Sequence, residues 1–184
     1  MPGTNPIEVL DFWFGVPRGK SRAQWFRKDD NFDAEIRRRF GQTHAAAARR
    51  ELEGWRAGPE SMVALVVVLD QFSRNLYRND AGAFAQDAHA RECSREALSR
   101  GDDARALPVE RMFLYLPFEH SEAAADQDRS CELMKDFDAE LRGYALRHRE
   151  IIRRFGRFPH RNAILGREST PEEVEFLKQP GSGF

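Results

Sequence analysis

The chain has 184 residues, a length typical of one domain, so we expect a single domain over residues 1–184. Its 29 basic and 30 acidic side chains give a formal net charge of −1, which argues against nucleic-acid or anionic-membrane binding driven by overall charge. The N-terminus shows no signal-peptide pattern, and the longest apolar run, residues 62–69, is far shorter than the roughly 20 residues of a membrane-spanning helix. Two cysteines, Cys93 and Cys131, lie far apart and form no C-x-x-C pair. A soluble cytoplasmic protein with free thiols is therefore expected.

Helical patterns begin at the N-terminus. Asn5-Pro6 is typical of an N-cap followed by a first-turn proline, and Gly15 is a natural stop for this first helix. From Asp30, phenylalanine and isoleucine recur every fourth residue. This apolar stripe predicts a second helix that continues through an alanine-rich stretch as far as Trp55.

The third element is ambiguous by composition. Gly58-Pro59 opens a segment that contains M-V-A-L-V-V-V-L, and its consecutive valines favour a strand. However, the apolar residues continue to Phe72 without a turn residue, and a proline occupies the expected first helical position. We therefore expect a helix that is apolar on all sides and lies at the centre of the core.

The remaining elements also have helical patterns. We expect helices over residues 80–101, over residues 108–117 with a break at Pro117, over residues 126–155, and from Thr170 onward. T-P-E-E at Thr170 is a capping box with a proline at the first helical position. The fold class predicted is all-α, a single-domain bundle of antiparallel helix hairpins. Tetratricopeptide-like stacking is compatible with these helix lengths, although no clean 34-residue repeat is visible.

The first candidate for chemistry is L-D-Q-F-S-R-N, residues 69–75. Asp70 follows directly on the apolar run, so a buried helix would draw its carboxylate toward the core, where an unpaired charge costs several kcal/mol. Arg74 lies one helical turn later and is expected to pair with it. Asn75 is a candidate for the left-handed residue at the helix end. A structural Asp–Arg pair and a functional site both explain this pattern.

The second candidate is L-P-F-E-H-S-E, residues 116–122, followed by Asp126 and Gln127. Its acids beside the imidazole of His120 are suited to general-base chemistry or to part of a metal site. The alternative is that these carboxylates only cap a helix and keep a loop soluble, and this alternative outweighs metal binding. The P-C-x-x-C that must accompany the H-x-E of zinc deaminases is absent, as are H-E-x-x-H, the P-loop, G-x-G-x-x-G and G-x-S-x-G.

His148 is the third candidate. Apolar and aromatic residues, Tyr144 among them, fall at helical spacing on its own face. A histidine in such a stripe is more often a hydrogen-bonded core residue than a ligand, and we interpret it so.

The fourth candidate is R-R-F-G-R-F-P-H-R-N, residues 153–162. Its first two arginines belong to a helix end, where cations complement the helix dipole, and Gly156 is the expected C-cap. The later polar residues stand on a loop that Phe158-Pro159 should anchor; they are Arg157, His160, Arg161 and Asn162. Arginine presents paired donors that suit carboxylate or phosphate, so we favour a functional reading for this loop.

Together these motifs resemble the bacterial domain-of-unknown-function family numbered 924. The resemblance rests on L-D-F-W-F-G, L-D-Q-F-S-R-N-L-Y-R, Y-L-P-F-E-H-S-E, R-F-G-R-F-P-H-R-N-A-I-L-G-R and S-T-P-E-E-x-x-F-L, and it spans nearly the whole chain. It implies an all-helical, tetratricopeptide-like fold and no established activity. The matching motif positions are Asp70, Gln71, Arg74, Asn75, Glu119, His120, Ser121, Glu122, Asp126, Gln127, His160, Arg161 and Asn162. Ser73 replaces the proline usual in the family, which leaves the backbone there less constrained.

These segments favour one polar pocket between helices. We assign proton transfer to Asp70, His120 and Glu122, and no metal. The ligand-binding side chains expected are Gln71, Arg74, Asn75, Asp126, Gln127, Arg157, His160, Arg161 and Asn162. The expected partner is a small phosphate- or carboxylate-bearing ligand, which the protein binds and, if it is an enzyme, hydrolyses. No cofactor is identified. The alternatives are a peptide-binding adaptor without catalysis and a buried polar network that only specifies the fold.

Overall fold

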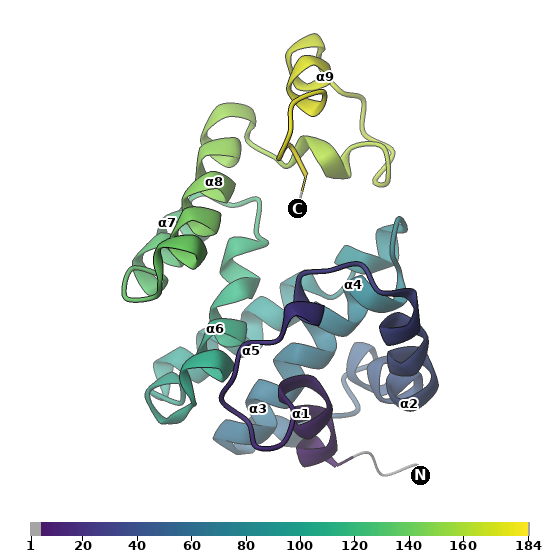
Figure 1. Cartoon of the computed structure of the whole chain (residues 1–184), viewed down its shortest axis with the longest axis vertical. Helices are drawn as coiled ribbons and strands as arrows, with labels where there is room; N and C mark the ends of the chain where they lie inside the picture. Colours follow the sequence, from purple (N-terminus) through teal and green to yellow (C-terminus); the bar gives the residue numbers. More distant parts are fainter. Residues whose placement is uncertain (1–4, 184) are drawn as a thin grey trace. The chain divides into compact units, whose positions relative to one another are not determined.

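The computed structural model describes residues 5–183, whose regular secondary structure is helical, with no strand within that range. The α-helices are α1 (Pro6–Phe14), α2 (Asp30–Ala48), α3 (Pro59–Val66), α4 (Ser73–Leu76), α5 (Asp87–Ser99), α6 (Pro108–Glu119), α7 (Ala124–Leu133), α8 (Ala139–Phe155) and α9 (Pro171–Leu177) (Figure 1). A π-helical turn, Val67–Phe72, joins α3 to α4. Short 3₁₀ turns cover Ala23–Trp25, Glu53–Ala57, Ala81–Phe84, Asp103–Arg105 and Pro159–Arg161. The all-α class is confirmed, and the tetratricopeptide-like detail stays a prediction.

The contacts divide the chain into two compact units. Unit 1 contains the described residues up to Arg78 together with Gly82–Pro117, and unit 2 contains Asn79–Ala81 and the residues from Phe118 onward. The boundary falls inside α6, after Pro117. Units defined by their internal contacts can belong to one domain or to two, so the single domain over residues 1–184 stays a prediction.

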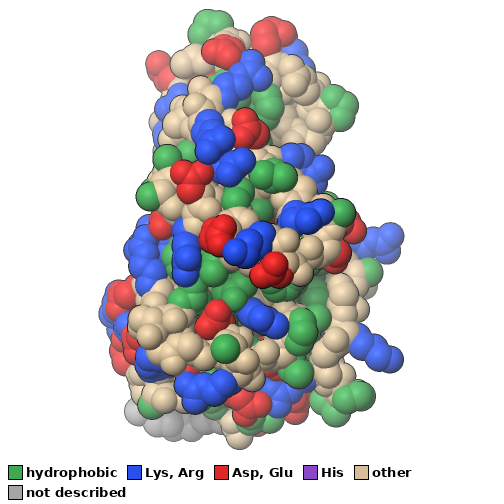
Figure 2. Space-filling model, turned by 90° about the vertical axis from the view of Figure 1, so that its left-hand side faces the viewer, with side chains coloured by type: hydrophobic (Ala, Val, Ile, Leu, Met, Phe, Trp, Pro, Cys, Tyr) green, Lys and Arg blue, Asp and Glu red, His purple; other side chains and the backbone are tan. Residues whose placement is uncertain are grey.

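Charged side chains of both signs are interspersed on the surface. Figure 2 shows Lys and Arg side chains mixed with Asp and Glu on one face, without a large block of either sign. Over residues 5–183, the helices are too short or too polar for any of them to span a bilayer.

Unit 1 has an aromatic core built on α1. The Asn5 side chain accepts from Ile7 N at 2.9 Å, and Gly15 closes the helix at φ 80°, as the sequence predicts. The ring of Trp13 meets that of Phe72 edge-on at 5.7 Å and that of Phe113 at 5.5 Å. Edge-to-face packing at these distances is favourable beyond the area that it buries. The core therefore joins α1 to the π-helical turn and to α6.

The second helix is shorter than the sequence predicts. α2 ends at Ala48 instead of continuing to Trp55, which lies in a separate 3₁₀ turn. Arg50 adopts φ 60°, and Glu51 N donates to Ala46 O at 2.9 Å, the arrangement of a Schellman cap. Glycine usually occupies this left-handed position. Because an arginine occupies it here, no residue of the local sequence marks the end of this helix.

The buried central helix is confirmed. Residues 62–73 are all buried, α3 packs against α1 and α5, and the π-helical turn packs against α2 (Figure 1). The helix continues through Ser73, whose Oγ donates to Leu69 O at 2.6 Å. That bond uses the single hydroxyl proton, so His44 Nε2, at 2.8 Å, is the donor to Ser73 Oγ.

The predicted role of Asn75 at the helix end is wrong. Asn75 lies within α4, and its Nδ2 donates to Asp33 Oδ1 at 2.7 Å. The left-handed residue is Asn79, with φ 59°. The helix continues past Asn75 because that side chain finds a partner on α2 instead of capping its own helix.

Two further helix boundaries differ from the prediction. α5 begins at Asp87 and not at Asp80, because a 3₁₀ turn, Ala81–Phe84, intervenes. α6 continues through Pro117 to Glu119 instead of breaking there. A proline removes one backbone hydrogen bond and strains the preceding turn. Residues 112–119 are all buried, so tertiary packing holds this helix together despite that local cost.

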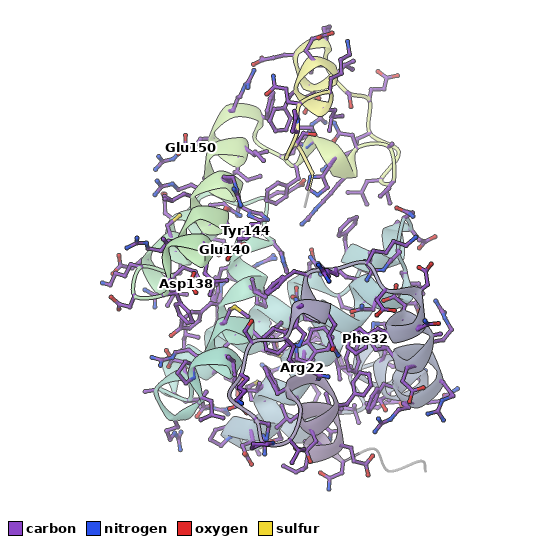
Figure 3. All side chains as sticks on the ribbon, viewed as in Figure 1. Arg22, Phe32, Asp138, Glu140, Tyr144 and Glu150 are labelled. Carbon is purple, nitrogen blue, oxygen red and sulfur yellow. The ribbon has the colours of Figure 1, made fainter. Side chains whose placement is uncertain are left out.

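Unit 2 begins with a helix hairpin in place of the single long helix expected. α7 and α8 pack side by side and are joined by the turn at residues 134–138 (Figure 1). Asp138 caps α8 by accepting from Leu141 N at 2.9 Å, and Figure 3 shows Asp138 at the beginning of the helix that carries Tyr144 and Glu150. Gly156 ends α8 at φ 70°, as predicted.

The capping box of α9 is confirmed. Thr170 Oγ1 accepts from Glu173 N at 3.2 Å, and Glu173 Oε2 accepts from Thr170 N at 2.7 Å.

Replacing Thr170 with alanine should therefore lower the free energy of unfolding by about 1 kcal/mol, since the first turn of α9 loses its side-chain acceptor. Urea unfolding followed by circular dichroism measures the change. Thr170→Ser retains the hydroxyl and should lose much less. Equal losses in the two variants would contradict a capping role.

Candidate functional site

Two of the predicted polar segments meet around one aromatic ring in unit 2. Phe158 is fully buried, and the guanidinium of Arg161 lies 4.6 Å from the centre of its ring. The ring centres of His148 and His160 lie 5.5 and 5.6 Å from that of Phe158. Phe158 therefore anchors the loop, as predicted, and also provides the surface on which three polar side chains rest.

The turn after α6 brings a further histidine close to His148. Arg161 Nη2 donates to the backbone oxygen of His120 at 3.0 Å, and the rings of His120 and His148 lie 6.4 Å apart. Glu119, the last residue of α6, places Oε1 3.3 Å from His148 Nδ1. We call these side chains the histidine cluster: Glu119, His120, His148, His160 and Arg161.

His148 is the most deeply buried histidine of the cluster. Its Nδ1 donates to Tyr144 O at 2.9 Å, so the prediction of a hydrogen-bonded core histidine is confirmed. Tyr144 itself is exposed and not part of the core stripe. Burial lowers the pKa of His148 to about 3, although the hydrogen bond to Tyr144 O opposes this shift, and the positive charges of its neighbours in the cluster lower it further. His148 is therefore neutral at physiological pH.

Glu122, a predicted proton-transfer residue, is held by a salt bridge. Its carboxylate accepts from Arg167 Nη1 at 2.8 Å and Nη2 at 2.9 Å, and from Phe158 N at 2.8 Å. Burial raises the pKa of Glu122, but the hydrogen bonds from Arg167 and Phe158 N outweigh it and leave the pKa below its usual value. The Glu122 carboxylate therefore helps to position the loop that carries Phe158, because it accepts a hydrogen bond from the backbone of that loop.

Asp126 and Gln127 hold the turn on which His120 lies. Ser121 Oγ donates to Asp126 Oδ2 at 2.7 Å. Gln127 is fully buried, and its Nε2 donates to Glu119 O at 2.7 Å and to Ser121 O at 2.6 Å. Both side chains come from α7, so this helix fixes the backbone on either side of His120.

Arg157 and Asn162, both predicted ligand-binding residues, share a partner on α9. Arg157 Nε and Nη2 donate to the two carboxylate oxygens of Glu173 at 2.7 and 2.8 Å. Asn162 Nδ2 donates to Ser169 Oγ at 3.0 Å and lies 3.3 Å from Glu173 Oε2. These contacts fasten the loop of residues 157–162 to α9 from both ends.

The remaining predicted segment, residues 70–75, belongs to unit 1. Asp70 is almost fully buried, and its Oδ1 lies 3.2 Å from Arg74 Nη1, so the predicted ion pair is confirmed. Gln71 Nε2 donates to Asp70 Oδ2 at 2.6 Å. Arg74 also forms a two-pronged contact with Asp87, at 2.9 and 3.2 Å. A π-helical turn such as the one that carries Asp70 is frequently found at functional sites.

Two segments of the predicted pocket are therefore joined within unit 2. The convergence of all three segments into one pocket stays a prediction, because residues 70–75 lie in the other unit.

Two hollows are lined by none of the predicted site residues. A hollow of about 390 Å³ in unit 1 is lined by Arg18, Pro59, Glu60, Val63, Arg105, Ala106, Leu107 and Glu110. A second, of about 330 Å³ in unit 2, is lined by Asp128, Cys131, Glu132, Lys135, Arg142, Leu146 and Arg149. Within residues 5–183, no group of three or more His, Cys, Asp or Glu side chains is arranged to hold a metal ion.

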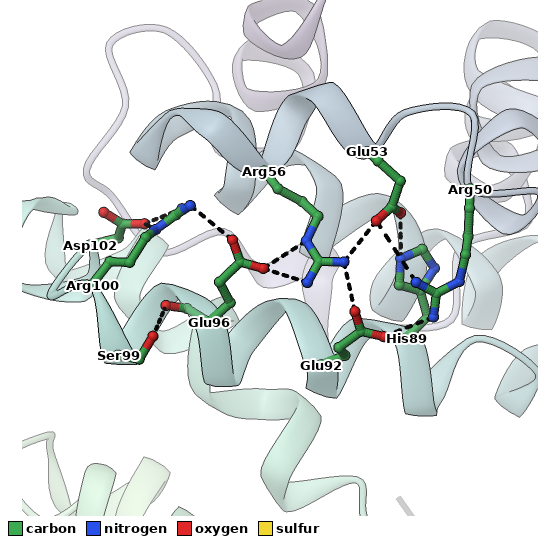
Figure 4. A network of polar contacts seen from close by, with 9 residues as sticks. All are labelled: Arg50, Glu53, Arg56, His89, Glu92, Glu96, Ser99, Arg100 and Asp102. Carbon is green, nitrogen blue, oxygen red and sulfur yellow. Dashed lines mark hydrogen bonds and ion pairs between the residues drawn. The ribbon is translucent and has the colours of Figure 1, made fainter.

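Unit 1 contains a network of ion pairs that the sequence analysis did not predict. Arg56 donates to Glu53 and Glu92, each at 2.7 Å, and also binds Glu96 on α5 (Figure 4). His89 Nε2 lies 3.0 Å from the same Glu53. The sequence analysis also left Glu119 out of the chosen site residues, although it lies in the matching E-H-S-E motif. Only its contact with His148, 29 positions further along the chain, brings it into the cluster.

These features define an all-helical protein that carries a largely buried cluster of histidine, arginine and glutamate side chains. The family model described as "Bacterial protein of unknown function (DUF924)" matches residues 9–181, and the chain belongs to this family. A solved structure of a protein of unknown function from Agrobacterium tumefaciens is similar over 95% of this chain and 97% of that chain, with 44% sequence identity and a TM-score of 0.90. No match was found among curated proteins.

Proposed function

We propose that the protein binds a small phosphate- or carboxylate-bearing ligand at the histidine cluster. The observation that supports this proposal is the gathering of His160 and Arg161 at the ring of Phe158, with Arg161 bonded to the backbone oxygen of His120, which comes from a distant segment. Glu119 is the single carboxylate of the cluster, whereas its other members are histidines and an arginine. A local excess of groups that carry or can gain positive charge favours an anion.

Arg161 is the expected primary contact for the anion. Its side chain is largely buried and is oriented by the bond to His120 O and by the face of Phe158. A guanidinium held in this way loses little conformational entropy when it binds an oxyanion, and its planar donors match phosphate and carboxylate geometry. The lowered pKa of His148, to which the charges of His120, His160 and Arg161 contribute, also indicates a positive local potential.

If the protein hydrolyses this ligand, we assign the proton transfer to His120. Of the three residues predicted for this role, Glu122 is bound to Arg167 and Asp70 is bound to Arg74. An imidazole titrates near neutral pH, which suits a general acid or base. His148, whose ring lies 6.4 Å from that of His120, and Glu119, which contacts His148, would orient the ring and the attacking water.

Replacing Arg161 with glutamine should abolish ligand-induced stabilisation. A ligand present at about ten times its Kd stabilises a protein by about 1.4 kcal/mol, which corresponds to about 3–5 °C in Tm for a chain of this length. We expect inorganic phosphate, phosphate monoesters or carboxylates to give such a shift in the unmodified protein. Differential scanning fluorimetry over a panel of these anions checks the result.

Arg153→Gln is the matched control. Arg153 lies on the exposed end of α8, where it contacts Asp128 and Glu150. This variant should respond to the anions as the unmodified protein does. If no anion stabilises the protein while peptides bind to it, the adaptor alternative is favoured instead.

A further inference from the structure

We infer that a second small ligand, an organic carboxylate with a short apolar chain, binds in the hollow of about 330 Å³ that the α7–α8 hairpin lines in unit 2. No residue of the histidine cluster lines this hollow, so the site is distinct from the one proposed above. The inference is based on two arginines in the hollow, Arg142 and Arg149, whose hydrogen-bond donors the protein does not fully use.

The helical period brings the residues of this hollow together. Arg142, Leu146 and Arg149 are four and three positions apart on α8, so they lie on one face of the helix. Asp128 and Cys131 are three positions apart on α7, which packs beside α8. The two helix faces therefore form two walls of one hollow.

Arg149 has a donor that the protein leaves unused. Its side chain is 23% exposed, and its Nε is buried without a hydrogen-bond partner among residues 5–183. Its ion pairs, with Asp128 at 3.8 Å and Glu150 at 3.7 Å, are longer than a hydrogen bond. Both acids are more than half exposed, so these ion pairs stabilise weakly. An oxyanion in the hollow would supply the missing acceptor.

Arg142 is the second cation available to a ligand. Its guanidinium is exposed and, within the described part of the chain, makes no hydrogen bond or ion pair. The acids of the hollow have other partners, because Lys135 lies 2.5 Å from Glu132 and Arg153 lies 3.1 Å from Asp128. The planar donors of a guanidinium suit a carboxylate, which they can bind through two parallel hydrogen bonds.

The other groups in the hollow select the kind of anion. Leu146 is 45% exposed and, with the Cys131 thiol, offers an apolar surface for a hydrocarbon chain. Asp128 and Glu132 also line the hollow, so they would repel a dianion such as sulfate more strongly than a monoanion. A volume of about 330 Å³ is at the lower end of the range of small-molecule sites, so the chain should be short.

Cys131 provides a chemical reporter for this hollow. It is partly exposed, whereas Cys93 is fully buried, and burial raises the pKa of Cys93 to about 12. Cys131 is therefore the thiol that should react in the folded protein. Burial also raises the pKa of Cys131, although the charge of Arg149 opposes this shift, so the reaction is best followed at mildly alkaline pH. Iodoacetamide is a suitable reagent because it is uncharged and does not compete for the arginines.

The test is the rate of Cys131 alkylation in the whole chain as butyrate is added at constant ionic strength, followed by intact-protein mass spectrometry. The matched probes are 1-butanol, which has the same chain without the charge, and sulfate, which has charge without a chain. NMR shifts of the Leu146 methyl signals, assigned with Leu146→Val, measure the same binding without relying on the thiol.

We expect butyrate to slow the alkylation in a saturable way, and 1-butanol and sulfate to bind at least about 10-fold more weakly. Arg142→Gln and Arg149→Gln should each weaken butyrate binding about 10-fold, because each removes a charge-assisted hydrogen bond. The control is Arg147→Gln on the same helix. Arg147 lies 4.3 Å from the centre of the Tyr144 ring and does not line the hollow, so this variant should bind butyrate unchanged.

Butyrate that neither slows the alkylation nor shifts the Leu146 signals would overturn the inference. Equally tight binding of 1-butanol or sulfate would do the same, as would butyrate binding that Arg142→Gln leaves unchanged. None of these outcomes bears on the function proposed for the histidine cluster, because both readouts come from residues that line the α7–α8 hollow.

Discussion

Replacing Arg74 with methionine should lower the free energy of unfolding by about 4 kcal/mol at pH 7. The guanidinium contacts the carboxylates of two buried residues, Asp70 at 3.2 Å and Asp87 at 2.9 Å, and also donates to Asp70 O at 2.9 Å. Methionine replaces the aliphatic part of the arginine side chain, so the loss comes mainly from two carboxylates left without their cation. Removing one partner of a buried ion pair typically costs about 3–5 kcal/mol.

The surrounding charges are consistent with this expectation. Burial tends to lower the pKa of Arg74, but the charges of Asp70 and Asp87 outweigh it and raise the pKa above the ordinary value. Chemical denaturation in urea gives the change in stability. The control is Arg38→Met, which removes an arginine that is 71% exposed and paired within one helix to Glu35. This control should change stability by no more than about 0.5 kcal/mol.

A second comparison separates charge from packing. The triple variant Arg74→Met, Asp70→Asn, Asp87→Asn removes the cation and both anions, so it should recover much of the stability lost by Arg74→Met alone. If Arg74→Met costs less than about 1 kcal/mol, or if the triple variant is no more stable, the pairing of Arg74 with these carboxylates does not stabilise unit 1.

Helix starts were predictable where a capping residue or a first-turn proline marks them in the local sequence. Asn5-Pro6, Gly58-Pro59 and the Thr170 capping box each act within a few residues of the chain, and each begins a helix where expected. Helix ends were predictable where a glycine marks them, as at Gly156. At Arg50 a non-glycine residue adopts the left-handed conformation, and nothing in the local sequence indicates it.

The remaining errors in the predicted helix boundaries are caused by tertiary packing or by a turn that the apolar pattern does not show. Pro117 does not end α6, since the packing of the buried residues 112–119 outweighs one missing hydrogen bond. The long pattern over residues 126–155 conceals a turn, because apolar spacing alone continues smoothly from α7 into α8. Asp138, an N-cap residue in the middle of that pattern, was the available signal.

The sequence indicated which polar segments belong to the site, but not which of their side chains pair with one another. Residue type and position correctly indicated that Phe158 anchors a polar loop. The partners could not be read from the sequence, because Glu122 meets Arg167 45 positions away and Arg157 meets Glu173 16 positions away. A salt bridge between distant segments leaves no local pattern. For this reason the sequence assigned ligand contacts to side chains that have partners within the protein.

Glu173 should contribute strongly to the acid dependence of stability. This residue is 2% exposed, and the hydrogen bond from Arg157, opposed by burial and assisted by Thr170 N, lowers its pKa to about 2 from 4.5. Because the folded pKa lies below the unfolded value, the stabilisation is fully present above about pH 5 and disappears as the pH falls toward 2. A shift of this size corresponds to roughly 2–3 kcal/mol.

Glu173→Gln tests this directly, because glutamine resembles the protonated acid in shape and keeps one oxygen to accept from Thr170 N. The variant should be about 2 kcal/mol less stable than the unmodified protein at pH 7, and this difference should shrink toward zero near pH 2. Urea unfolding at intervals from pH 7 to pH 2 measures it. Glu175→Gln, at a carboxylate that is 70% exposed, should show a difference near zero throughout. A difference for Glu173→Gln that stays constant with pH would mean that its charge does not hold the loop of residues 157–162 to α9, and that shape alone does.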